Sequence, residues 1–120
     1  MTELIIYHNP KCSKSRQTLE LIKNQNLQPK IVLYFDEKLS QEELKNIISK
    51  LGIEARTLLR KNENDYKENN LDNPNLTDEE LVELMLRFPK LMERPIVVKG
   101  EQAVIGRPPE NVLELILKGE

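Results

Sequence analysis

Short apolar runs and helical periods alternate along the first part of this 120-residue chain. Residues 3–7 are apolar and β-rich, which predicts a buried strand. Apolar positions spaced along residues 13–24 predict an amphipathic helix, and Pro29 prevents that helix from continuing. A second apolar run over residues 31–35 predicts another strand. A strand, a helix and a strand in this order imply a parallel pair joined by a right-handed crossover.

Two capping boxes mark helices in the middle of the chain. Ser40 is followed three residues later by Glu43, and Thr77 is followed in the same way by Glu80. In this motif each side chain hydrogen-bonds to the backbone N–H of the other residue, so each pair predicts the start of a helix. Gly52 stands where the first of these helices should end, as a C-cap glycine does.

The remaining segments complete the predicted elements. Residues 53–60 predict a second short helix, and the Asn-rich stretch 61–75 predicts a mostly exposed connection. Residues 94–98 and 103–105 are apolar runs on either side of a short polar turn, which predicts a β-hairpin. Pro108-Pro109 opens a last helix, because proline is tolerated in a first helical turn.

The order of these elements favours an α/β fold. A βαβ half and a ββα half predict a four-stranded mixed sheet flanked by helices, with a helical insertion over about residues 40–90 between the halves. This is the thioredoxin-like plan, although ferredoxin-like and other α/β sandwiches share pieces of the same order. The length fits one domain over residues 1–120.

Composition and charge narrow the range of partners. The net charge is −2, so no global basic field favours nucleic acid. No apolar run approaches the ~18 residues that a membrane span needs, and the N-terminus lacks the positive region of a signal peptide. A single cysteine cannot form an internal disulfide, which argues for a reducing compartment. We therefore expect a cytoplasmic protein with no nucleic-acid or membrane partner.

The one cysteine, Cys12, falls between the first predicted strand and the N-terminus of the first predicted helix. The helix dipole, unpaired N–H groups and the cations of Lys11, Lys14 and Arg16 all favour the thiolate, so we expect a lowered pKa. An inert buried thiol is the alternative, but this loop is too polar and too charged to bury easily. The one histidine, His8, either tunes the thiol as a cation or hydrogen-bond donor, or has a structural role.

Spacing around Cys12 limits its chemistry. Ser15 occupies the position where a dithiol redox pair has its second cysteine, so an adduct on Cys12 needs an external thiol. Ser15 itself either hydrogen-bonds the thiolate or serves the first helical turn. A Cys-x5-Arg phosphatase loop is excluded, because Thr18 stands six residues after Cys12. One cysteine and one histidine also fall short of a four-ligand zinc site, and we expect no metal.

Four separated motifs follow one another along the chain: YHNPKCSKSRQTLELI, RTLLRKNE, RPIVV and IGRPPE. From about residue 4 to 117 the chain closely resembles the glutaredoxin-dependent arsenate reductase family, which has a thioredoxin-like fold. In that family a cysteine attacks arsenate, glutathione forms a mixed adduct, and glutaredoxin reduces the adduct to release arsenite. The resemblance thus implies a thiol oxidoreductase with glutathione as co-substrate, glutaredoxin as partner and no bound cofactor.

The resemblance also implies the residues of the site. Three arginines would hold the oxyanion, and a planar guanidinium suits that task because it offers paired donors. By motif position the set is Cys12 as nucleophile, His8 and Ser15 as catalytic residues that lower its pKa, Arg60, Arg94 and Arg107 as substrate-binding residues, and Pro95 as a cis-proline facing the cysteine.

Two other functions are compatible with the same fold. A related branch contains redox-responsive regulators that bind RNA polymerase without turnover. Those regulators typically carry Cys-x-x-Cys near the N-terminus, and Ser15 speaks against such a dithiol switch. The other alternative is a monothiol oxidoreductase that acts on a different substrate, such as glutathione mixed disulfides.

Overall fold

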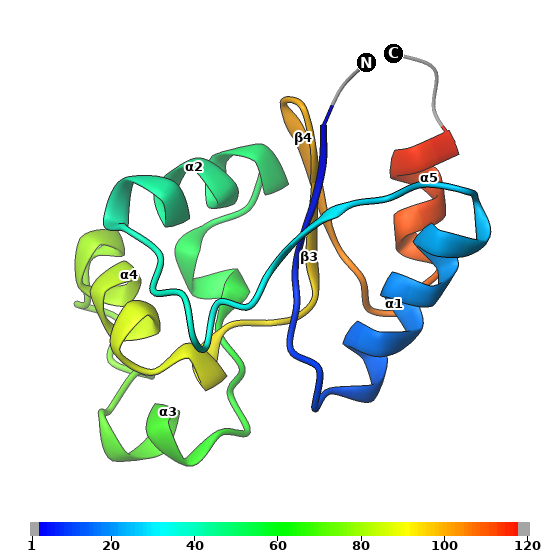
Figure 1. The fold of residues 1–120 in the computed structure, drawn as a ribbon. Helices are drawn as coiled ribbons and strands as arrows, with labels where there is room; N and C mark the ends of the chain where they lie inside the picture. Colours follow the sequence, from blue (N-terminus) through cyan, green and yellow to red (C-terminus); the bar gives the residue numbers. More distant parts are fainter. Residues whose placement is uncertain (1–2, 118–120) are drawn as a thin grey trace. The chain divides into compact units, whose positions relative to one another are not determined.

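The structure is a computed structural model that describes residues 3–117 of the chain (Figure 1). It divides into two compact units. The first combines the residues up to Glu37 with those from Arg94 onward, and the second consists of Lys38–Glu93. The second unit coincides with the predicted helical insertion. That the chain forms a single domain stays a prediction.

The first unit is built on a four-stranded mixed sheet with the strand order β2-β1-β3-β4. Its strands are β1 (Leu4–Tyr7), β2 (Lys30–Val32), β3 (Ile96–Lys99) and β4 (Gln102–Ile105). β1 pairs in parallel with β2 and antiparallel with β3, and β3 and β4 form the predicted hairpin. The mixed sheet inferred from the element order is confirmed.

Two helices cover one face of this sheet. α1 (Ser13–Asn24) has the predicted bounds, and α5 (Asn111–Leu117) lies beside it (Figure 1). Ile6 of β1 and Val97 of β3 are cross-strand partners, so their side chains leave the sheet on the same face. With the buried faces of the two helices they form the core of this unit, which consists of Ile6, Ile22, Val97, Val112 and Leu115.

The second predicted strand is shorter than its apolar run. β2 ends at Val32, whereas the prediction extended over residues 31–35. The carbonyl oxygen of Leu33 accepts hydrogen bonds from the backbone N–H groups of Asp36 (2.9 Å) and Glu37 (2.8 Å), which closes a turn. Phe35 in this turn is 41% exposed, so the apolar run does not mark a fully buried strand.

The second unit is helical. The predicted short helix over 53–60 is a four-residue 3₁₀ turn, because only Ala55–Leu58 is helical. A second 3₁₀ turn follows the last long helix of this unit and begins at a proline. In chain order the elements are α2 (Gln41–Leu51), η1 (Ala55–Leu58), α3 (Asn64–Glu68), α4 (Asp78–Arg87) and η2 (Pro89–Leu91).

The predicted helix caps are present. The Ser40 hydroxyl accepts the backbone N–H of Glu43 at 3.0 Å. Thr77 and Glu80 form a complete capping box, with N–H to side-chain distances of 3.2 and 3.0 Å. Gly52 ends α2 with a φ of +69°, a left-handed conformation that glycine adopts without strain.

The stretch over residues 61–75 is more structured than predicted. It contains α3 and a fully buried leucine, Leu71. The Leu71 N–H donates to the Tyr66 carbonyl oxygen at 3.0 Å, and the Arg56 guanidinium donates to the carbonyl oxygens of Leu71 (2.6 Å) and Asn73 (2.9 Å). One apolar anchor and one arginine therefore hold a segment whose asparagines are typical of an exposed loop. None of the helices within residues 3–117 is long and apolar enough to cross a membrane.

Candidate active site

The loop after β1 brings Cys12 to the N-terminus of α1. Cys12 is the N-cap residue, with an extended backbone (φ −94°, ψ 123°), and its thiol is partly exposed. Its N–H donates to the Asn9 carbonyl oxygen, and its own carbonyl oxygen accepts the N–H of Arg16, both at 3.0 Å. The sulfur thus lies where the first N–H groups of a helix have no partner in the helix itself. The predicted position of the cysteine is confirmed.

Burial raises the pKa of the Cys12 thiol, but hydrogen bonds outweigh that effect and lower the pKa below its ordinary value. The donors are the backbone N–H of Ser15, the Arg94 side chain and the backbone N–H of Lys14, and the charge of Arg94 acts in the same direction. The thiol pKa is therefore lowered by helix N–H groups and by an arginine that is distant in the sequence, and not by the ammonium groups of the loop. Arg16, also singled out in the sequence, donates from Nη1 to the Pro10 carbonyl oxygen at 2.8 Å.

Two of the three predicted arginines meet at the sulfur. Arg107 lies just after β4, and its Nη2 is 3.5 Å from Cys12 Sγ. Its Nε donates to the carbonyl oxygen of Arg94 at 2.8 Å. Arg94 lies before β3 and hydrogen-bonds the thiol, and the bond to the following Pro95 is cis, the form that the resemblance implies. The segment before β3 and the segment after β4 thus each present one guanidinium to Cys12.

Arg60, the third predicted arginine, belongs to the second unit. Its Nε lies 3.4 Å from a carboxylate oxygen of Glu93 and 3.9 Å from one of Glu63. Its backbone N–H donates to the Leu91 carbonyl oxygen at 2.7 Å, and its Nη1 is buried with no hydrogen-bond partner within residues 3–117. The role of Arg60 as a substrate ligand stays a prediction.

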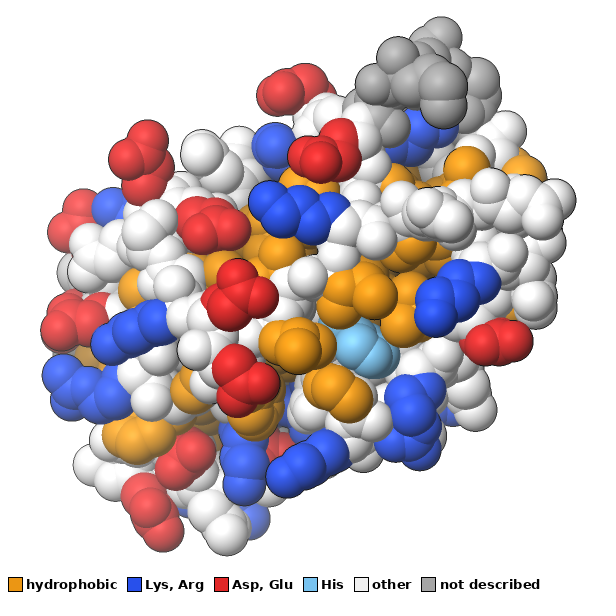
Figure 2. All heavy atoms as spheres, viewed as in Figure 1, with side chains coloured by type: hydrophobic (Ala, Val, Ile, Leu, Met, Phe, Trp, Pro, Cys, Tyr) orange, Lys and Arg blue, Asp and Glu red, His pale blue; other side chains and the backbone are white. Residues whose placement is uncertain are grey.

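His8 and Ser15 form a buried pair beneath the cysteine loop. His8 Nδ1 and Ser15 Oγ are 2.6 Å apart, and Ser15 Oγ also accepts the Asn9 N–H at 3.0 Å. Burial, and then the charges of Arg16 and Lys23, lower the pKa of His8, so the imidazole is neutral near pH 7. The idea of His8 as a cation beside the thiol is therefore wrong at this pH. The His8 residue is 6% exposed. Figure 2 shows a face of the molecule on which charges of both signs are interspersed.

Ser15 acts on the sulfur through its backbone. Its hydroxyl is engaged with His8 and Asn9, while its N–H hydrogen-bonds the thiol. The alternative that the side chain itself holds the thiolate therefore finds no support in this geometry. Whether the side chains of His8 and Ser15 lower the thiol pKa indirectly stays a prediction.

Asn9 is a positioning residue that the sequence reasoning missed. It is buried, its Oδ1 accepts the Lys11 N–H at 3.1 Å, and its carbonyl oxygen accepts the Cys12 N–H. Its own N–H donates to the Ser15 hydroxyl. These three hydrogen bonds of Asn9 together fold the loop around the cysteine. The signal was available, because asparagine before proline is typical of such a turn.

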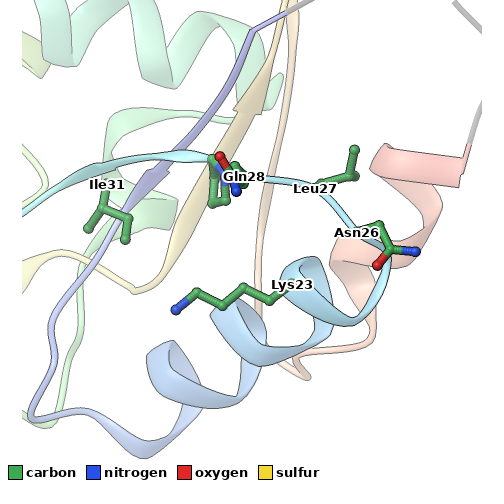
Figure 3. Close-up of a pocket in the computed structure, with 6 residues that line it drawn as sticks. Lys23, Asn26, Leu27, Gln28 and Ile31 are labelled. Atoms are coloured by element: carbon green, nitrogen blue, oxygen red, sulfur yellow. The ribbon is translucent and has the colours of Figure 1, made fainter.

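A cleft of about 520 Å³ opens at the other end of α1. Its lining combines one ammonium group, two amides and three apolar side chains (Figure 3): Lys23, Asn26, Leu27, Gln28, Pro29 and Ile31. Cys12 precedes the first turn of α1 and Lys23 lies in its last turn, so the cleft is separate from the thiol. Its connection to the site is electrostatic, since the Lys23 charge contributes to the lowered pKa of His8.

These groups can support nucleophilic chemistry on an anion. A thiol with a lowered pKa supplies the nucleophile, and two guanidinium groups beside it supply paired donors. Within residues 3–117, no three histidine, cysteine, aspartate or glutamate side chains are grouped so that they could hold a metal ion.

A four-stranded mixed sheet with a reactive cysteine in its first strand-to-helix loop defines the class of thioredoxin-like thiol proteins. Residues 7–115 match the ArsC family, and the chain belongs to that family. It is 49% identical to an arsenate reductase from Haemophilus influenzae over 94% of this chain and 98% of the other. It is also 49% identical to the uncharacterised protein YfgD of Escherichia coli, over 92% of this chain and 94% of the other.

Solved structures agree with this assignment. An arsenate reductase from Vibrio cholerae superposes with a TM-score of 0.91 at 50% identity, covering 94% of this chain and 97% of the other. The thioredoxin-like fold predicted from the order of the elements and from the resemblance is confirmed.

Proposed function

We propose that this protein reduces arsenate to arsenite, with Cys12 as the nucleophile and glutathione and glutaredoxin as the source of electrons. The observation that carries the proposal is the convergence of Arg94 and Arg107 on a thiol of lowered pKa, with Arg107 Nη2 at 3.5 Å from the sulfur. The choice of substrate is supported by family relatives that are named arsenate reductases and that match this chain over nearly their whole length.

The reaction takes four steps, in which atoms and electrons balance. The Cys12 thiolate attacks arsenic(V) and displaces a hydroxide, and glutathione then displaces a second oxygen as water. A glutaredoxin thiolate attacks the glutathione sulfur, and the electron pair of the broken sulfur–arsenic bond stays on arsenic, which becomes arsenic(III). Water then releases arsenite and the Cys12 thiolate, while glutaredoxin carries glutathione as a mixed disulfide. Ser15 in place of a second cysteine is the reason that an external thiol is required.

The arginines offset an electrostatic cost. Arsenate is an anion near neutral pH, so its approach to a thiolate is repulsive. Guanidinium groups beside the sulfur attract the oxyanion and stabilise the negative charge of the transition state. Arg94 and Arg107 occupy these positions, and we assign Arg60 the same role on the basis of its motif.

The test is a coupled assay with arsenate, glutathione, glutaredoxin, glutathione reductase and NADPH. Wild-type protein should oxidise NADPH above the blank, and Cys12→Ser should abolish that activity. Arg107→Lys should lower kcat/KM by roughly 10- to 100-fold, because lysine cannot bridge the sulfur and the Arg94 carbonyl and loses a charge-assisted hydrogen bond. Arg87→Lys is the matched control, since Arg87 is exposed on α4. An inert wild-type protein, in a mixture where a known arsenate reductase works, would refute the proposal.

The same assay separates the two alternatives. A monothiol oxidoreductase would act faster on a small glutathionylated substrate than on arsenate, and both reactions would need Cys12. A regulator would show neither activity and would recover RNA polymerase subunits in a pull-down. The partly exposed thiol favours the enzymatic readings, because an external thiol must reach the sulfur.

A further inference from the structure

Gly106 lies between β4 and Arg107, at a point where the chain comes very close to its neighbours. A Cβ atom added at Gly106 would lie 2.6 Å from Thr18 Oγ1, 3.1 Å from Thr18 Cγ2 and 2.9 Å from Pro95 Cγ. Real Cβ atoms essentially never show contacts below 3.0 Å, so any other residue here forces the Thr18 side chain, the Pro95 ring or the backbone at residue 106 to shift. Glycine is needed here for space, since its φ lies outside the left-handed region.

Thr18, the residue that Gly106 touches, is itself fixed in position. It is fully buried in α1, and its hydroxyl shares one proton between the carbonyl oxygens of Lys14, at 2.8 Å, and Gly106, at 3.4 Å. From the other side, the Gly106 N–H donates to the Pro95 carbonyl oxygen at 2.9 Å. Gly106 is therefore held between α1, which starts at the cysteine, and the first residue after Arg94.

The neighbouring residue is the one whose guanidinium contacts the sulfur. Because Arg107 is bonded directly to Gly106, the position of the glycine sets where the Arg107 side chain begins. We propose that Gly106 and Thr18 are a positioning pair that aims Arg107 at Cys12 by fixing the backbone that carries it. Neither residue touches the sulfur, and both act through Arg107. The consequence for arsenate turnover rests on the proposed function, whereas the placement of a cation at the thiol does not.

The preference of the thiol for an anionic reagent reports this placement directly. Iodoacetate and iodoacetamide alkylate the same thiolate, so the ratio of their rate constants cancels the fraction of thiolate and retains the attraction of the anion. Displacing one unit charge by a few ångströms from a partly exposed sulfur should lower this ratio roughly two- to tenfold. A merely structural role would lower both rates together or neither.

The experiment compares Gly106→Ala, Arg107→Gln and the double variant with wild type. If the glycine acts through Arg107, each single variant lowers the ratio and the double variant is no lower than Arg107→Gln alone. Thr18→Ala in the Gly106→Ala background removes both threonine contacts and should restore part of the ratio. An unchanged ratio in folded Gly106→Ala, or two fully additive effects, overturns the proposal.

A second variant keeps the test decisive if Gly106→Ala does not fold. Thr18→Val keeps the shape of the side chain and removes both hydrogen bonds of its hydroxyl, so it should lower the ratio in the same direction, and an unchanged ratio overturns the pair. Thr57→Val, at an exposed threonine, is the matched control. If wild type fails in the arsenate assay while the ratio still falls in Gly106→Ala, the proposed function is wrong and the positioning pair stands.

Discussion

The side chain and the backbone of Ser15 serve different partners, and Ser15→Ala separates them. The hydroxyl is fully buried and contacts His8 Nδ1 at 2.6 Å and the Asn9 N–H at 3.0 Å. The backbone N–H, which alanine retains, is the group that hydrogen-bonds the Cys12 sulfur. We expect this substitution to reduce stability substantially while the pKa of the thiol stays close to its wild-type value.

The magnitude follows from the groups left without a partner. A buried polar group that loses its hydrogen bond costs about 1–3 kcal/mol, and Ser15→Ala leaves two such groups, the Asn9 N–H and His8 Nδ1. The free energy of unfolding should therefore fall by about 2–6 kcal/mol. That is a large part of the ~5–15 kcal/mol typical of a folded protein, so the effect is well within reach of urea unfolding.

The assay pairs urea unfolding with the pH dependence of Cys12 alkylation. Ser13→Ala is the matched control, because Ser13 is the exposed first residue of the same helix and should change neither measurement. The reasoning fails if Ser15→Ala leaves stability intact and moves the alkylation midpoint upward by about one pH unit, equivalent to 1.36 kcal/mol. That result would mean that the hydroxyl itself holds the thiolate.

Three further predictions concern stability. Because the pKa of His8 is lower in the folded than in the unfolded protein, stability should fall as the pH drops below the unfolded value of 6.5, and His8→Asn should flatten this slope in urea unfolding at a series of pH values. Thr77→Ala should cost about 1 kcal/mol by loss of the capping box, while Ser49→Ala on the exposed face of α2 should cost almost nothing. Leu71→Ala should cost about 2–5 kcal/mol in the same measurement, and equal costs for Leu71 and the less buried Leu76 would contradict its role as an anchor.

Elements whose signals are local were predictable from the sequence. The bounds of α1, the caps at Ser40 and Thr77 and the C-cap at Gly52 depend on residues within one helical turn, and all agree with the structure. The apolar run after Pro29 was misleading at its end, because a strand at the edge of a sheet pairs on one side only and its length depends on that neighbour. Leu71 was missed because a single apolar residue in a polar stretch has no period to reveal it.

The features of the site also divide into those that the sequence predicted and those that it did not. The position of Cys12 at a helix N-terminus follows from the first strand and helix, and the arginines at the two ends of the hairpin follow from the motifs. The helix N–H groups were expected to lower the thiol pKa, and they do so, but the expected contribution of the nearby cations is not among the causes. An ammonium group on a flexible stem is strongly hydrated and need not approach the sulfur, whereas a backbone N–H at a helix start has a fixed direction.

The neutral imidazole fits this distribution of charge. His8 is buried in a region where Arg16 and Lys23 already disfavour another cation, and its ring is held by a serine rather than by a carboxylate. A charged His8 would therefore add repulsion and a desolvation cost without a counter-ion. The loop instead uses His8, Ser15 and Asn9 as a neutral hydrogen-bonded support, and positive charge reaches the sulfur through Arg94 and Arg107. Rigidity and charge at the thiol thus come from different residues, which is why substitutions in the support should change stability and substitutions of the arginines should change reactivity toward anions.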